Sequence, residues 1–311
     1  MSALVHLPGM TPLERFVRGL VATTLPLSML ACGGTGPRVP PCNVPPDKII
    51  TVSGGGLPDG GSPGDGGISP SDCNALCMAN FYRCSIVSTD GGSTQIDCAA
   101  ALCLGRRPEG LVAQREAADT LGAFFAQAAQ LEAASVPAFS RLGRELLSFG
   151  APPALAARCR DAARDEVRHA RSMRSLASRF GSAPAPVELA PFRSRSLEEL
   201  AVENAVEGCT RELFGAVVGV WQAEAANDAE IRAAMRGIAA DEIRHAELAF
   251  DIAAWAAPLL SAEARARVES ARRESLADLR RAALAPRAVD LVDLAGLPPP
   301  DAAAALADAL G

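Results

Sequence analysis

The stretch Asp165-Glu166-Val167-Arg168-His169-Ala170 recurs 76 residues later as Asp241-Glu242-Ile243-Arg244-His245-Ala246. Both copies lie in segments whose apolar residues recur every three to four positions, which is the pattern of an amphipathic helix. In each copy the Glu and the His three residues later share one helix face, about 5–6 Å apart. The repeat therefore predicts two helices, each with a Glu-x-x-His pair on its buried stripe.

A further carboxylate precedes each pair, again on an apolar stripe. Glu132 lies 34 residues before Glu166, and Glu207 lies 35 residues before Glu242. The matching distances favour Glu207 over its neighbour Glu203, and they indicate two helix hairpins, each with one lone Glu and one Glu-x-x-His. Capping and helix-breaking residues place four helices and a fifth amphipathic stretch at about 109–149, 153–180, 196–226, 227–257 and 261–284.

Four carboxylates at one level of an apolar core would repel one another, and burying them is costly unless cations are bound. Two divalent metal ions would cancel their charge. The predicted metal ligands are Glu132, Glu166, His169, Glu207, Glu242 and His245. Asp165 and Asp241 are either hydrogen-bond partners of the histidines or surface residues. The alternatives are a chance solvent-facing Glu-x-x-His and a descendant of a metal protein that has lost its metals.

This ligand set resembles that of the ferritin-like di-iron carboxylate superfamily. The sequence around Glu132, around Glu207 and over residues 241–247 is similar to that of a bacterial group of uncharacterised ferritin-like lipoproteins. The resemblance covers residues 111–256 and implies an all-α fold, a four-helix bundle made of two helix hairpins with a crossover. It also implies that Glu166 and Glu242 bridge two iron ions, or an iron–manganese mixture, with Glu132 and Glu207 as terminal ligands.

Carboxylate and imidazole ligands with open metal positions suit reactions of iron or manganese with oxygen or peroxide. The resemblance therefore implies an oxidoreductase of peroxidase, ferroxidase or oxygenase type, with oxygen or peroxide as the small oxidant and an unidentified electron donor. No tyrosine occurs within residues 108–258, which argues against a radical generator. The alternative is a non-enzymatic surface lipoprotein, either a metal-stabilised scaffold or an iron-binding protein.

The N-terminal region is predicted to direct export. Residues 1–31 have a basic stretch and then an apolar run, the pattern of a signal peptide. The stretch 28–33 resembles a bacterial lipobox, which makes Cys32 the predicted lipidation site; a plain cleaved signal is the alternative. The predicted location is the periplasmic side of the envelope or the cell surface, with membrane contact through the lipid anchor only.

The amino-acid composition separates the rest of the chain into a linker, a Cys-rich module, the helical bundle and a C-terminal extension. Glycine and proline predict a flexible linker over 32–72, and a net charge of −6 argues against a nucleic-acid partner. A Cys-rich module is expected over 73–107, followed by the bundle at 108–258 and a C-terminal helical extension at 259–311. In an exported protein the disulfide candidates are Cys42, Cys73, Cys77, Cys84, Cys98 and Cys103, with a zinc site as the alternative.

Overall fold

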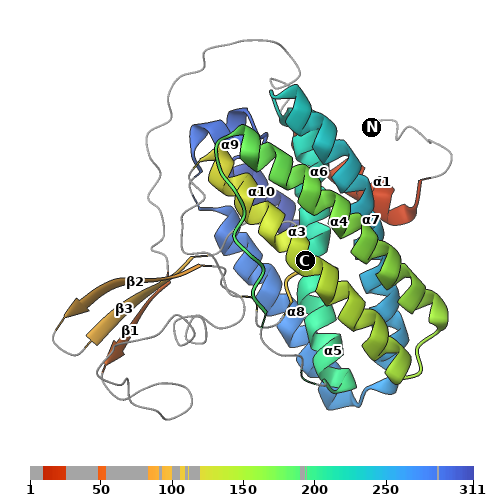
Figure 1. Cartoon of the computed structure of the whole chain (residues 1–311). Coiled ribbons are helices and arrows are strands. Elements are labelled where there is room, and N and C mark those ends of the chain that lie inside the picture. Colours follow the sequence, from red (N-terminus) through yellow and green to blue (C-terminus); the bar gives the residue numbers. More distant parts are fainter. Residues whose placement is uncertain are drawn as a thin grey trace.

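The computed structural model describes residues 10–25, 48–53, 83–90, 93–99, 106–108, 111, 120–189, 193, 195–285 and 287–311. Most of these residues form a helical body, and a small three-stranded sheet lies to one side of it (Figure 1). The prediction of a helical protein is confirmed for the body. The sheet is an addition that the sequence patterns do not predict.

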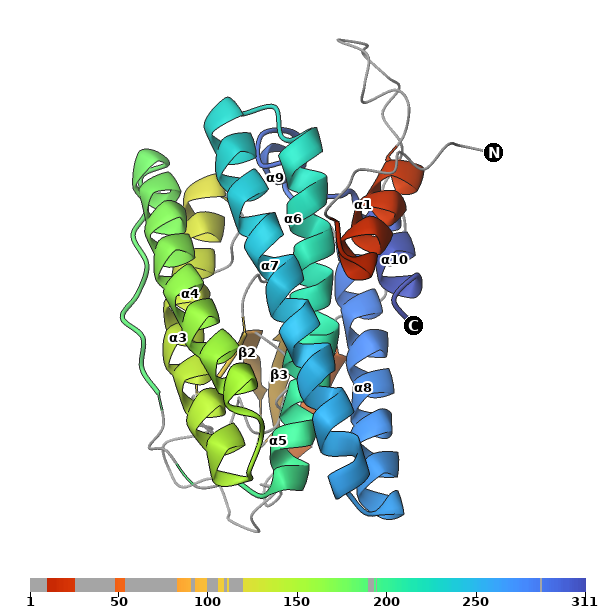
Figure 2. The same cartoon turned by 90° about the vertical axis from the view of Figure 1, so that its right-hand side faces the viewer.

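Four long helical segments lie side by side in the body (Figure 2). The third segment is interrupted by a π-helix, η2, and so consists of three consecutive elements. The segments are α3 (Leu121–Ser148), α4 (Pro153–Arg179), α5 (Leu197–Glu203) with η2 (Asn204–Glu212) and α6 (Leu213–Ala225), and α7 (Ala229–Ala256).

Local sequence signals set the ends of these helices. The Thr120 hydroxyl accepts from the backbone N–H of Ala123 at the start of α3, and Ser196 forms a capping box with Glu199 at the start of α5. Gly150 lies in the turn between α3 and α4 with a φ of 78°, a left-handed conformation that favours glycine. Helix α3 begins at Leu121, whereas the sequence pattern predicts a start near residue 109.

The segments form two hairpins, α3 with α4 and α5–η2–α6 with α7. The described residues 180–189 of the connection run along the body from the end of α4 toward the level where α5 begins (Figure 2), and α4 and α5 run in the same direction. The Gln130 side chain of α3 donates to the carbonyl of Pro186 at 3.0 Å and fastens this connection to the body. The hairpins meet where α4 contacts α7.

Two apolar clusters fill the body and leave a polar layer between them. One cluster includes Phe125, Met173 and Trp221, and the other includes Phe139 and Leu155. Because each helix crosses from one cluster to the other near its middle, the carboxylates and histidines at the helix centres occupy the layer between the clusters. The apolar stripes of the sequence therefore place the polar residues in the interior.

The C-terminal region adds helices outside the four segments. They are η3 (Ala257–Leu259), α8 (Ala262–Ala283), α9 (Val289–Asp293) and α10 (Pro300–Asp308). Helix α8 packs against η2 and α5, and α10 packs against α8. Helix α8 lies within the stretch 261–284, for which the sequence predicts an amphipathic helix.

Helix α1 (Pro12–Thr24) lies inside the segment predicted to be a signal peptide. It packs against α6 and α10, with Val17 and Val21 buried in the larger apolar cluster. Among the described residues, no helix combines the length and the apolar character that crossing a bilayer requires.

The sheet consists of β1 (Lys48–Ser53), β2 (Arg83–Asp90) and β3 (Ser93–Ala99), in the antiparallel order β1-β3-β2. Strand β1 lies inside the segment 32–72, for which the sequence predicts only a flexible linker. The backbone register places Cys84 opposite Cys98. The side chains of these two cysteines, and all of Cys32, Cys42, Cys73, Cys77 and Cys103, lie outside the described part of the chain.

Candidate metal centre

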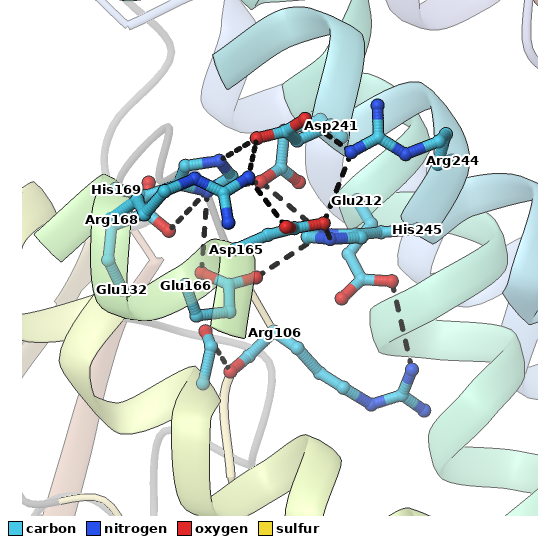
Figure 3. Close-up of polar contacts among 12 residues, drawn as sticks. Arg106, Glu132, Asp165, Glu166, Arg168, His169, Glu212, Asp241, Arg244 and His245 are labelled. Atoms are coloured by element: carbon cyan, nitrogen blue, oxygen red, sulfur yellow. Dashed lines mark hydrogen bonds and ion pairs between the residues drawn. The ribbon is translucent and has the colours of Figure 1, made fainter. Parts of the chain in front are cut away.

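Five of the six predicted ligands converge in the polar layer between the two apolar clusters (Figure 3). Each of the five is at most 2% exposed to solvent. Three helices supply them: Glu132 comes from α3, Glu166 and His169 come from α4, and Glu242 and His245 come from α7.

The side chains form two overlapping groups, in each of which one ligand atom per residue lies within 4.8 Å of the others. The first group is Glu132, Glu166, His169 and Glu242, and the second is Glu166, Glu212 and His245. Glu166 belongs to both groups. Oε1 of Glu242 also faces both, because it lies 3.2 Å from Nδ1 of His169 and 3.6 Å from Nδ1 of His245.

The structure does not bring the sixth predicted ligand, Glu207, into either group. One of its carboxylate oxygens accepts from the Arg211 guanidinium at 2.5 Å, and the other accepts from the backbone N–H of Arg107 at 3.1 Å. Glu212, one π-helical turn further along, occupies the place expected for Glu207. The distance match with the first hairpin therefore selects a carboxylate that lies outside the two groups.

The π-helix explains this difference. Residues three and four apart share a face of an α-helix, but each π-helical hydrogen bond spans five residues, so the face shifts across residues 204–212. The Thr210 hydroxyl follows the wider period by donating to the carbonyl of Ala205 at 2.8 Å. One sequence signal does identify Glu212, since it is the last charged residue before the apolar run 213–220.

Each histidine is oriented by an aspartate of the opposite hairpin. Nε2 of His169 lies 2.9 Å from Asp241, and Nε2 of His245 lies 3.3 Å from Asp165. Because a carboxylate only accepts hydrogen bonds, Nε2 carries the proton in both rings. In the neutral imidazole, Nδ1 then presents its lone pair to the carboxylates, the orientation that a metal ligand requires.

Two arginines complete this arrangement at the surface. Nη2 of Arg168 lies 2.6 Å from Asp165 and 3.0 Å from Asp241, and Nη2 of Arg244 lies 3.3 Å and 2.5 Å from the same two carboxylates. Both arginine side chains are about half exposed. The two repeats therefore interlock, since each Asp contacts the His and the Arg of the other repeat.

The inward-facing ligand atoms lack hydrogen-bond partners. All eight carboxylate oxygens of the four clustered glutamates, and Nδ1 of both histidines, are buried without a partner among the described residues. Leaving a buried charged group unpaired is costly, so these atoms fit the donor set of a cation site. The four glutamates are Glu132, Glu166, Glu212 and Glu242.

The electrostatics of the cluster indicate stored protons when no cation is bound. Burial and the neighbouring charge of Glu166 raise the pKa of Glu132, and burial raises the pKa of Glu212 to about 8. Burial alone would lower the pKa of His169, but its hydrogen bond to Asp241 and the nearby carboxylates of the clustered glutamates raise it above its ordinary value. A divalent cation would replace these protons.

One buried cation that the sequence patterns do not reveal lies beside the cluster. Arg106 precedes the helical body in sequence and is 1% exposed, with Nη1 lying 3.7 Å from Oε2 of Glu212. Two cysteines of the helical body, Cys159 and Cys209, are buried and free. Burial raises the pKa of each thiol to about 12.

Comparisons with protein-family models, with curated proteins and with solved structures found no match to this chain. The functional proposal therefore rests on the geometry of the buried cluster.

Proposed function

We propose that this protein is a ferritin-like di-metal carboxylate protein whose polar layer holds two metal ions, most suitably iron. The observation that carries the proposal is the set of ten unpartnered ligand atoms from four glutamates and two histidines, buried at one level of the body. Four carboxylates supply a charge of −4, which two divalent cations neutralise. The set has the composition of the di-iron sites in ferritin-like bundles, with a Glu from each of two helices and Glu-x-x-His from each of the others.

The two groups assign a role to each ligand. Glu132 and His169 would hold one ion, Glu212 and His245 would hold the other, and Glu166 and Glu242 would lie between them. The contacts of Glu166 and Glu242 with both histidines support the bridging role. This assignment keeps the roles that the family resemblance implies, with Glu212 in place of Glu207.

The donor types support iron or manganese over softer metals. Carboxylate oxygens and imidazole nitrogens suit these ions, and no thiolate belongs to either of the described groups. Bound iron would supply accessible one-electron redox changes and open coordination positions for oxygen or peroxide. The protein would contribute the orientation of each imidazole through Asp165 and Asp241, and a buried environment that separates the ions from bulk water.

We therefore propose an oxidoreductase that reacts with oxygen or hydrogen peroxide and receives electrons from a separate donor. The test is to add ferrous iron to the metal-free protein without oxygen, and then to add air or peroxide. Ultraviolet absorption and electron paramagnetic resonance should show oxidation of both irons within one site, without an organic radical. Iron that stays ferrous under both oxidants would favour the non-enzymatic scaffold.

Metal stoichiometry tests the site independently of activity. The wild-type protein should bind two Co²⁺ ions per chain, and Glu166→Ala and Glu242→Ala should each abolish tight binding because each removes a carboxylate that faces both histidines. The matched control is Glu247→Ala, also on α7 but outside both groups. Full binding by both shared-ligand variants would refute the proposed centre.

The proposed location is the outer side of a bacterial membrane, with a lipid on Cys32. The lipobox-like residues 28–33 support this proposal. Removal of residues 1–31 would also remove α1 and its contacts with α6 and α10. Radiolabelled palmitate should label the wild type and not Cys32→Ser, and an unlabelled wild type would refute lipidation.

A further inference from the structure

Residues 106–108, which we call the strap, pass between the two hairpins beside the second group of ligands. The carbonyl of Arg106 accepts from the Ser135 hydroxyl of α3 at 2.8 Å, and the backbone N–H of Arg107 donates to Glu207 of η2 at 3.1 Å. The strap therefore links the first hairpin to the π-helix of the second through its own backbone. Its position also explains why Glu207 is occupied with structural contacts.

The Arg106 guanidinium reaches both ends of the π-helix. Its Nε and Nη2 donate to the two oxygens of Glu203 at 2.9 and 2.8 Å, and Nη2 also donates to Asn204 Oδ1 at 3.2 Å. At the other end Nη1 lies 3.7 Å from Glu212. That distance allows a charge interaction but no hydrogen bond, so the Glu212 oxygens stay available for a cation.

A second contact chain leads from Arg106 to the histidine of the same group. The guanidinium carbon lies 5.6 Å from the centre of the Phe139 ring, and this ring centre lies 5.1 Å from that of His245. Arg106 thus touches Glu212 directly and His245 through one aromatic ring (Figure 3 shows Arg106, Glu212 and His245). The charged neighbours of Glu132, the corresponding ligand of the first group, are instead His169 and Glu166.

The π-helix packs closely on its neighbours, and the absence of a side chain at Gly208 leaves room for the Arg106 guanidinium. A Cβ placed on Gly208 would lie 3.0 Å from Nη1 of Arg106 and 2.5 Å from Cβ of Ala249 on α7. Asn204 in turn donates to the carbonyl of Ala249 at 2.9 Å. The residues around Arg106 therefore hold η2 close to α7, which supplies two of the clustered ligands.

We propose that Arg106 is a positioning residue for the second metal position. It holds the π-helical segment 204–212 in the register that presents Glu212, and not Glu207, to the cluster. The two metal positions are therefore unequal, and the second depends on a chain segment that precedes the helical body. This inference rests on the proposed function, because it assumes that the cluster binds two metal ions.

The test is a Co²⁺ titration of the full-length protein, followed by visible absorption and by metal analysis. Removing Arg106 alone would take both hydrogen bonds from the partly buried Glu203 and leave it only the longer contact with Arg195 at 3.6 Å, so the main variant is the double substitution Arg106→Gln with Glu203→Gln. The first Co²⁺ should bind as in the wild type, and the second should bind about tenfold more weakly. The absorption of the second ion should change as well. Glu212→Gln should also spare the first ion, and it should lose the second ion because it changes the ligand itself.

Two further variants keep the result interpretable. Arg106→Lys retains the charge without the planar fork of donors, so its second-site affinity should lie between the wild type and the double variant. The matched control is Arg195→Gln with Glu145→Gln, which removes another buried Arg–Glu pair. Arg195 also lies 3.6 Å from Glu203, but its contacts in the described structure do not extend to 204–212. This control should bind both ions normally.

Unchanged binding of both ions in the folded double variant, or in Arg106→Lys if the double variant does not fold, would overturn the role of Arg106. Equal weakening of both ions would also overturn it, since the role is confined to the second position. Glu166→Ala separates this outcome from failure of the proposed function. If Glu166→Ala loses both ions while the Arg106 variants keep both, only the inference fails; if Glu166→Ala keeps both ions, the metal centre itself is refuted.

Discussion

Nε2 of His169 on α4 lies 2.9 Å from the Asp241 carboxylate on α7, and the reciprocal pair, His245 with Asp165, joins the same helices in the opposite sense. Each hairpin therefore orients a candidate metal ligand that belongs to the other. Docking of the hairpins and orientation of the imidazoles are consequently one event, because neither histidine has its Asp partner until α4 meets α7.

Asp241→Asn should weaken Co²⁺ binding by about 10- to 100-fold, the usual cost of losing the partner of a ligating histidine. The new amide N–H₂ can donate to Nε2, which would move the ring proton to Nδ1 and block the ligand atom. Competition with a chromophoric chelator measures the affinity. Asp161→Asn, an exposed change on α4, is the control and should leave the affinity as in the wild type. Equal affinity of all three proteins would contradict the orienting role.

Glu212→Gln and Glu207→Gln should have different effects on metal content. Glu212 has two unpartnered buried oxygens, whereas both oxygens of Glu207 accept hydrogen bonds from Arg211 and Arg107. We expect Glu212→Gln to lose the second metal ion and Glu207→Gln to keep both. Mass spectrometric metal analysis of the purified variants decides between the two residues. Loss of metal only in Glu207→Gln would restore the spacing-based assignment.

Gly208→Ala should destabilise the protein by about 1–3 kcal/mol, because the added methyl group would overlap Cβ of Ala249. Gly237→Ala is the matched control, since Gly237 is an exposed residue of α7 and a Cβ added there would have nothing within 4 Å. That control should stabilise the protein by about 0.5–1 kcal/mol through helix propensity. Urea denaturation measures both changes, and equal stability of the two variants would argue against close packing of η2 on α7.

The metal-free protein should lose stability as the pH rises from about 4.5 toward 8. Burial raises the pKa of Glu212 to about 8 in the folded chain, and the pKa of His245 is also raised, with burial opposed by the charge of Glu242 and the hydrogen bond to Asp165. A group whose folded pKa exceeds its unfolded pKa stabilises the fold at low pH, and this contribution is lost as the pH rises through that interval.

Bound metal should reverse this trend, because it requires deprotonated ligands. The difference in Tm between Co²⁺-loaded and chelator-treated protein should therefore grow between about pH 5 and pH 8. Thermal unfolding at several pH values measures it, with Glu166→Ala as the variant in which the difference disappears. A difference that shrinks as the pH rises would contradict the buried ligand set.

Thiol labelling should distinguish the two core cysteines from the rest. Cys159 and Cys209 are buried, and their pKa values are raised to about 12, so they should resist alkylation in the native protein. In denaturant they should be the two reactive thiols. In the antiparallel register Cys84 lies directly opposite Cys98, and directly opposed residues lie within disulfide range. Cys84–Cys98 is therefore the disulfide to test first among the six remaining candidate cysteines. Many more reactive thiols would favour the zinc alternative.

The sequence alone determined the helices and most of the ligands because these features depend on residues close together in the chain. Helix ends follow from local caps such as Ser196 with Glu199, and the three-residue spacing places Glu166 and His169 on one face of α4. Burial of these polar residues follows from the apolar stripes around them. The repeat made a two-hairpin arrangement predictable as well.

Tertiary structure alone decided which carboxylate completes the cluster. An α-helical period points to Glu207, but contacts of Arg106 with Glu203 and Asn204, and the approach of Gly208 to Ala249, accompany a π-helix that brings Glu212 inward. These partners are up to about a hundred residues apart in the chain. The small sheet and the two reciprocal His–Asp pairs also join residues that are far apart in the chain. A local pattern cannot specify such contacts, because they form only when distant segments pack together.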